Sequence, residues 1–84
     1  MGMFRKHRKW FDAVERMLEL HFHRTTENGL HKRILVMKAT TKRGRRMRHG
    51  MPHLASVNYV LASDSRFVYK GNDVWGLRKL EVTA

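Results

Sequence analysis

The sequence contains no cysteine and a single proline, Pro52, among its 84 residues. Without cysteine the chain can form neither a disulfide framework nor a thiolate metal site, which fits a reducing compartment. No apolar run approaches the roughly 18–20 residues that a membrane-spanning helix needs. The basic N-terminus is not followed by the apolar segment of a signal peptide. We therefore expect a cytoplasmic protein, associated with the nucleoid if its partner is DNA.

Acidic residues are scarce as well. The chain has 7 Asp and Glu against 18 Lys and Arg, which gives a formal net charge of +11. Self-repulsion on this scale destabilises a compact state, and chains that tolerate it usually bind a polyanion. Nucleic acid is the first candidate, ahead of an anionic membrane or an acidic protein. Counterion release would make such binding fall steeply with salt.

Motifs for catalysis and metal binding are missing too. The sequence has no H-E-x-x-H and no phosphate-cradling G-x-x-x-x-G-K-[ST]. Its six histidines show no ligand spacing with acids, and no pair of carboxylates is placed for acid–base chemistry. We therefore expect a protein that is not an enzyme and that uses no cofactor and no metal ion.

What remains is the composition of one small globular domain, with 42% hydrophobic residues and eight aromatics. We expect this domain over residues 10–84. Residues 1–9 carry four cations and no acid, and positive charge opposes the macrodipole at a helix N-terminus. They therefore predict a basic arm or a frayed first turn, either solubilising or in contact with phosphates.

Apolar spacing predicts three helices. Residues 10–22 place apolar side chains at three- and four-residue steps, which makes one buried face. Residues 30–39 predict a second helix, although the run ILVM within them could also be a strand. Residues 51–63 predict a third helix with Pro52 in its first turn. Its outward side carries His53, Ser56, either Asn58 or Tyr59, and Ser63.

A charge run separates the second and third predicted helices. Five cations lie within the seven residues 42–48, and no Asp or Glu occurs from Asn28 to Ser63. Arginine outnumbers lysine four to one here, and its planar fork suits phosphate oxygens and guanine edges. The alternative reading is a solvated face, which a run without any compensating anion disfavours.

The C-terminal stretch predicts a β-hairpin. Residues 66–69 and 74–77 are rich in aromatic and β-branched side chains, and Gly71-Asn72-Asp73 between them tolerates positive φ. The spacing L-x-x-D-x-R-F-x-x-x-G-x-x-x-W-G-L-R resembles the HARE-HTH winged-helix domain, a family that includes the N-terminal domain of the bacterial RNA polymerase delta subunit. About 20 residues carry the resemblance, and the upstream helices are far more basic than in that family. The residues that match are Leu61, Asp64, Arg66, Phe67, Gly71, Trp75, Gly76, Leu77 and Arg78.

The resemblance implies an α+β winged helix-turn-helix, with three helices followed by a two-stranded β-hairpin wing. It also implies that Asp64 ties the corner before the hairpin, that Arg66 pairs with it, and that Phe67 and Trp75 anchor the hairpin to the helices.

From these features we expect a small transcription regulator that binds double-stranded DNA. Helix 52–62 would enter the major groove, while basic loop 42–48 and the wing tip would contact phosphates. The alternative is a protein-interaction module that binds RNA polymerase or an associated factor; a weaker third reading is RNA binding. The expected nucleic-acid-binding residues are Lys42, Arg43, Arg45, Arg46, Arg48, His53, Ser56, Asn58, Lys70 and Arg78.

Overall fold

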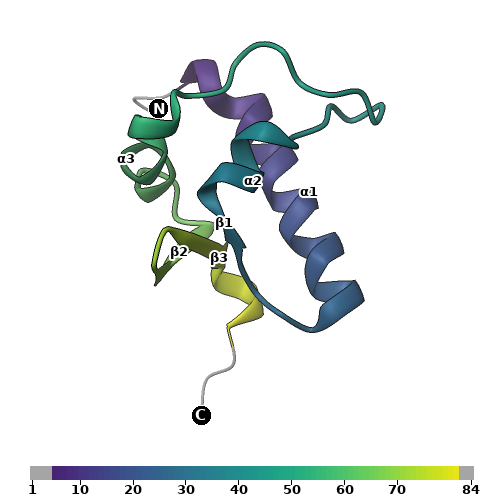
Figure 1. Cartoon of the computed structure of the whole chain (residues 1–84), viewed down its shortest axis with the longest axis vertical. Helices are drawn as coiled ribbons and strands as arrows, with labels where there is room; N and C mark the ends of the chain where they lie inside the picture. The colour runs from purple at the N-terminus through teal and green to yellow at the C-terminus, as the bar shows by residue number, and fades with distance from the viewer. Residues whose placement is uncertain (1–4, 82–84) are drawn as a thin grey trace.

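The computed structural model describes residues 5–81, which form a small α+β domain of three α-helices and a three-stranded antiparallel sheet. The predicted α+β class is confirmed. Figure 1 shows the helices around and above the sheet, with both described chain ends at opposite poles of the molecule. No helix among residues 5–81 is both long and apolar enough to cross a membrane.

The first helix is longer than its prediction. A 3₁₀ turn, η1 (Arg5–His7), leads into α1 (Arg8–Thr25). The structure thus differs from the predicted arm at residues 5–9, while residues 1–4 lie outside the described residues. The imidazole of His7 is the reason: it is buried, its Nδ1 lies 2.9 Å from the carbonyl oxygen of Gly50, and its ring meets the edge of Trp10. These contacts hold the segment helical despite the unfavourable dipole.

The second predicted helix divides into two elements. Residues Leu30–His31 form the strand β1, and Lys32–Met37 form the helix α2. His31 caps α2, because its Nδ1 accepts a hydrogen bond from the backbone N–H of Arg33 at 3.1 Å. The ILVM run is therefore helical, and the strand lies directly before it.

The third helix is shorter than expected. A 3₁₀ turn, η2 (Leu54–Ser56), precedes α3 (Val57–Ala62). The predicted start at residues 51–52 is wrong, because His53 has extended backbone and Pro52 is buried in the loop before the helix. Val57, Val60 and Leu61 point into the core.

The predicted hairpin is confirmed as β2 (Phe67–Gly71) and β3 (Val74–Leu77). Asn72 and Asp73 both have positive φ, 52° and 61°, as a tight hairpin turn requires. The sheet has one strand more than predicted, since β1 pairs with β3 through Leu30 and His31. The strand order is therefore β1-β3-β2, and a last 3₁₀ turn, η3 (Arg78–Leu80), follows β3.

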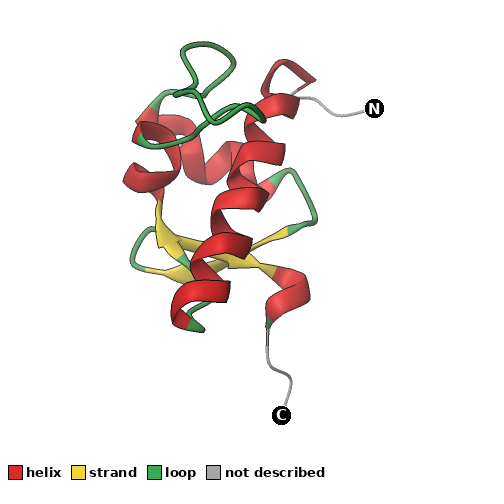
Figure 2. Ribbon diagram, turned by 90° about the vertical axis from the view of Figure 1, so that its right-hand side faces the viewer, coloured by secondary structure: helices red, strands yellow, loops and turns green. Residues whose placement is uncertain are grey.

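One core holds these elements together. Trp10 of α1 is fully buried, and its Nε1 donates to the carbonyl oxygen of Leu35 in α2 at 3.0 Å. Phe67 and Trp75 are buried as predicted and join the hairpin to the helices. Figure 2 shows the sheet beside the long α1 helix, with the loop of residues 38–53 standing off at the far end from the C-terminus.

Candidate nucleic-acid interface

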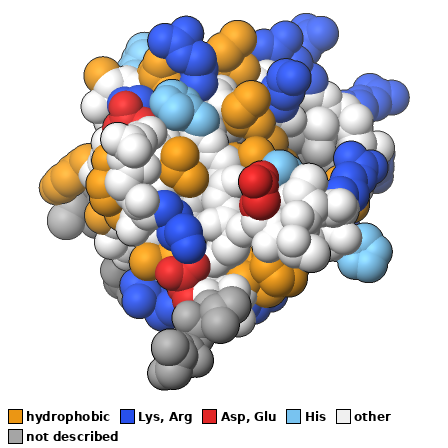
Figure 3. All heavy atoms as spheres, turned by 60° about the horizontal axis from the view of Figure 1, so that its bottom comes forward, with side chains coloured by type: hydrophobic (Ala, Val, Ile, Leu, Met, Phe, Trp, Pro, Cys, Tyr) orange, Lys and Arg blue, Asp and Glu red, His pale blue; other side chains and the backbone are white. Residues whose placement is uncertain are grey.

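All seven acidic side chains have a basic partner. Glu27 lies 3.2 Å from the Nε2 of His21, and the other six are within 4 Å of Lys or Arg nitrogens. Only four of the 18 Lys and Arg side chains take part in these pairs: Lys32, Arg66, Lys70 and Lys79. The other fourteen have no ion pair within residues 5–81. Figure 3 shows acidic side chains beside basic ones on the face nearest the C-terminus.

Arg66 is the centre of the largest ion-pair cluster. Its guanidinium donates to Asp64 at 2.9 Å, to Asp12 at 2.9 Å and to Glu15 at 3.0 Å. The hydrogen bonds from Arg66 hold the pKa of Asp64 below its ordinary value. Burial raises the pKa of Glu15, but hydrogen bonds from Arg66 and Lys79 outweigh it and leave that pKa lowered. The pairing of Arg66 with Asp64 that the resemblance implied is confirmed.

Three of the expected DNA-contacting residues have structural partners. The Asn58 side chain accepts from the Trp75 indole N–H at 2.8 Å and donates to Asp73 at 3.1 Å. Lys70 forms an ion pair with Glu81. Arg78 donates to the carbonyl oxygens of Ser65 and Phe67. The structure therefore engages these three side chains within the fold, and Lys70, the cation expected at the wing tip, is paired with Glu81.

The charge run forms an ordered structure that we call the basic finger, residues 39–47. Its two sides pair through an antiparallel β-bridge between Thr40 and Arg46. The backbone N–H of Met47 also donates a hydrogen bond to the carbonyl oxygen of Ala39. Gly44 turns the chain with a φ of 85° and has open space around it. Met47 and Ala39 are buried in the core and fix the base of the finger. The finger thus presents Lys42, Arg43, Arg45 and Arg46 on a folded support.

The finger and the first turns of α1 form one basic end. A cleft between them is lined by cations of both elements, and a second hollow continues from Lys9 across η1 to Gly50. A third hollow then leads from Lys6 and Gly50 to His53, Ser56 and Tyr59. The three hollows share lining residues and make a continuous surface. Its basic side chains are Arg5, Lys6, Arg8, Lys9, Arg16, Lys42, Arg43 and Arg45.

The exposed face of η2 and α3 lies at one border of this basic end. Ala55 and Ser56 are small and exposed, and Tyr59 is 66% exposed. On the side of η1 this face adjoins Lys6, and on the side of α2 it adjoins Arg33 in a hollow that also contains the Lys32–Asp73 ion pair. Of the two alternatives left by the sequence, Tyr59 points outward and Asn58 turns toward the hairpin.

Two residues of this surface, Arg16 and Arg33, were not predicted from the sequence. Arg16 lies one turn beyond Asp12 on α1, and its guanidinium reaches the carbonyl oxygen of Thr40 at 3.2 Å. Arg33 was assigned to no site, because its place depends on how α2 rotates against the core. The only sequence signal for Arg33 is that it lies in the stretch from Asn28 to Ser63, which contains no Asp or Glu. Tyr59 was one of the two outward alternatives on the third predicted helix. Arg48 and His49, also exposed, extend the basic end beyond the finger.

Within residues 5–81 no group of three or more His, Asp or Glu side chains is placed to hold a metal ion. No protein-family model, curated protein or solved structure matches this chain.

Proposed function

We propose that this chain is a winged-helix-type domain that binds double-stranded DNA and acts as a small transcription regulator. The exposed face of η2 and α3 enters the major groove, with Lys6 and Arg33 on the phosphates at either side. The finger and the first turns of α1 contact phosphates farther along the duplex. The basic loop, His53 and Ser56 remain in the interface as the sequence predicted. In this proposal η1 and α1, and not the hairpin tip, supply the additional phosphate contacts.

One observation supports the proposal most strongly. A helix face of small and polar side chains, Ala55 and Ser56 among them, lies between unpaired cations of two other elements. A base-reading helix needs this arrangement, because small side chains allow close approach while flanking cations neutralise both phosphate strands. The one acid that lines the hollows on either side of this face, Asp73, forms an ion pair with Lys32 and accepts a hydrogen bond from Asn58.

Replacing Ser56 by Glu tests the helix face. Ser56 precedes the first residue of α3 and is exposed, so a carboxylate there suits the helix dipole and leaves folding intact. We expect the variant to bind duplex DNA about tenfold more weakly or worse, measured by fluorescence anisotropy. The control is Leu20→Glu on the exposed side of α1, which changes the net charge equally and should alter affinity less than about twofold. Equal losses in both variants would remove α3 from the interface.

Replacing Arg45, Arg46 and Arg48 together by Ala tests the basic loop 42–48, which comprises the tip of the finger and the arginine that follows it. Each phosphate contact contributes about 0.9 to the slope of log K against log salt on B-DNA. The triple variant should therefore flatten this slope by about 2–3, while Arg24→Ala at the far end of α1 should leave it nearly unchanged. An unaltered slope in the triple variant would exclude the loop from phosphate contact.

Binding to RNA polymerase is the alternative to direct DNA recognition. A protein-docking surface needs a contiguous apolar patch. Among residues 5–81 the exposed large hydrophobic residues are instead distributed over α1, α2, α3 and β2, as Leu20, Met37, Tyr59 and Tyr69. Capture of polymerase that persists after nuclease treatment would favour the alternative, and its loss would point to tethering through DNA.

A further inference from the structure

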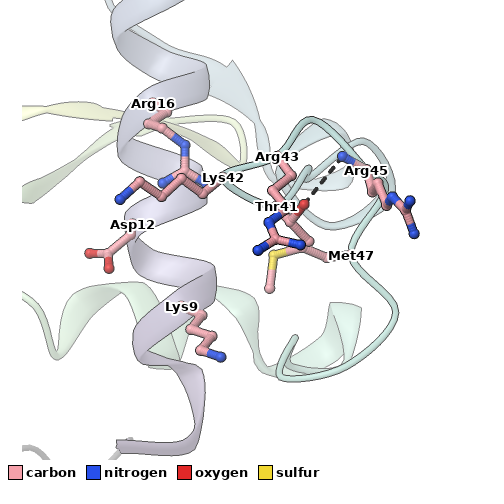
Figure 4. Close-up of a pocket in the computed structure, with 8 residues that line it drawn as sticks. All are labelled: Lys9, Asp12, Arg16, Thr41, Lys42, Arg43, Arg45 and Met47. Carbon is pink, nitrogen blue, oxygen red and sulfur yellow. Dashed lines mark hydrogen bonds between the residues drawn. The ribbon is translucent and has the colours of Figure 1, made fainter.

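The cleft between α1 and the basic finger has the character of a binding site in its own right. It has a volume of about 610 Å³ and is lined by five cations from two elements: Lys9, Arg16, Lys42, Arg43 and Arg45. Figure 4 shows Lys9 and Arg16 on the helix facing the loop that carries Lys42 and Arg43, with Met47 at the base between them. A volume of this size is in the range of small-ligand sites.

The cleft has almost no internal countercharge. Its one acid, Asp12, accepts a hydrogen bond from Arg66 at 2.9 Å, and Figure 4 shows its carboxylate directed away from the loop. None of the five cations forms an ion pair within residues 5–81. Like charges gathered around a hollow repel one another, and an anion placed among them relieves this repulsion.

Neutral donors and rigid walls complete the site. The Thr41 hydroxyl accepts a hydrogen bond from the backbone N–H of Arg45 at 3.2 Å. Its own proton is therefore available for an acceptor in the cleft. One wall is the N-terminal half of an 18-residue helix, and the other is fixed by buried Met47. The hydrogen bond from Arg16 to Thr40 holds the two walls at one spacing.

We propose that this cleft binds a pair of neighbouring phosphate groups, which the arginine forks and lysine ammonium groups neutralise together. A single phosphodiester carries one negative charge, too few for five cations, whereas two linked phosphates match the surplus better. The phosphates come either from adjacent positions of a nucleic-acid strand or from a free diphosphate compound. The site does not depend on α3 binding DNA.

Inorganic pyrophosphate is the probe, followed by backbone amide shifts in NMR spectra at low salt. We expect saturable shifts at residues 41–47 and in the part of α1 that carries Lys9 and Arg16. The variant Lys42→Gln/Arg43→Gln should weaken binding about tenfold. The matched control, Arg24→Gln/Lys38→Gln, removes the same charge from exposed positions outside the cleft and should weaken it less than about twofold.

Competition then identifies the source of the phosphates. If the cleft seats a nucleic-acid backbone, pyrophosphate and duplex DNA displace each other at the residues of the finger. If it seats a free diphosphate, both bind at once and the pyrophosphate shifts persist in the DNA complex. Equal weakening in the cleft variant and its control, or shifts spread over all exposed cations, overturns the proposal whatever the outcome of the DNA experiments.

Discussion

At the residue scale, the side chain of Arg66 shows why a cation in a basic protein need not serve binding. Its guanidinium joins the corner before the hairpin, through Asp64, to α1, through Asp12 and Glu15. It also lies 5.8 Å and 5.4 Å from the ring centres of Phe11 and Phe67. Arg66 thus connects two elements electrostatically and by packing, and its guanidinium is engaged within the fold.

Replacing Arg66 by Met should lower the free energy of unfolding by about 1–2 kcal/mol at neutral pH, because the partly exposed ion pairs are lost while packing on the two rings is kept. The carboxyl pKa values of Asp64 and Glu15 lie below their ordinary values of 3.8 and 4.5 in the folded protein. Their ion pairs therefore stabilise the fold fully above these values and lose their effect as the pH falls through the lowered ones.

Urea denaturation from pH 7 to pH 2.5 would measure this effect. The unvaried protein should lose stability below about pH 4.5, and the Arg66→Met curve should be flatter over the same range. Parallel curves for the two proteins would show that Arg66 does not set these pKa values.

At the element scale, β3 is the central strand because β1 pairs with one of its edges and β2 with the other. A side chain from the loop before β1 adds to the contacts on the β1 edge. The side-chain oxygen of Asn28 accepts a hydrogen bond from the backbone N–H of Leu77 at 2.8 Å. Its amide nitrogen donates a hydrogen bond to the carbonyl oxygen of Leu77, also at 2.8 Å. Gly76 is what allows this approach, since a Cβ at that position would lie 2.7 Å from the Asn28 backbone oxygen. The strand β1 continues the pairing along this same edge of β3, where Leu30 lies opposite Trp75, and β2 occupies the other edge.

Replacing Gly76 by Ala should therefore cost about 2–4 kcal/mol of stability, because a backbone atom cannot move aside as a flexible side chain can. Gly44→Ala is the matched control: its surroundings are open, and only the positive φ opposes the new methyl group, at about 1 kcal/mol. Thermal and urea denaturation of both variants would distinguish these costs. A Gly76→Ala protein as stable as the control would mean that β3 can shift away from Asn28.

At the scale of the whole molecule, charge is segregated. The paired acids occupy the face of α1 and the sheet end, and the unpaired cations gather where η1, the first turns of α1 and the finger meet. The ion pairs therefore stabilise the fold at one end of the molecule, while repulsion among the unpaired cations destabilises it at the other end.

We expect repulsion to dominate, because fourteen cations lack an ion pair and the ion pairs are partly exposed. The free energy of unfolding should then rise when sodium chloride is increased from about 20 mM to about 200 mM, within the range over which screening becomes strong. Urea denaturation is the suitable measurement, because urea adds no ions. A fall in stability over this range would show that the ion pairs around Arg66 outweigh the repulsion.

The elements that depend on local chemistry could be predicted from the order of residues alone. Apolar spacing located α1, the positive-φ tolerance of Gly71-Asn72-Asp73 located the hairpin turn, and the acid-free run from residue 40 to 50 located the basic loop. Each is set by neighbours within a few residues, which a periodic pattern or a turn motif records. The resemblance to a winged-helix family added the pairing of Arg66 with Asp64.

The places where charges gather became known only from the folded arrangement of the elements. Whether Asn58 or Tyr59 faces outward depends on the rotation of α3 against the core, and the two-residue strand β1 exists only because β3 is there to pair with it. The sequence does not indicate a partner for Lys70 or Arg78. In the folded chain Lys70 forms an ion pair with Glu81, and Arg78 donates hydrogen bonds to two backbone carbonyl groups. These are long-range contacts, and neither residue spacing nor composition specifies which partners the folded chain brings together.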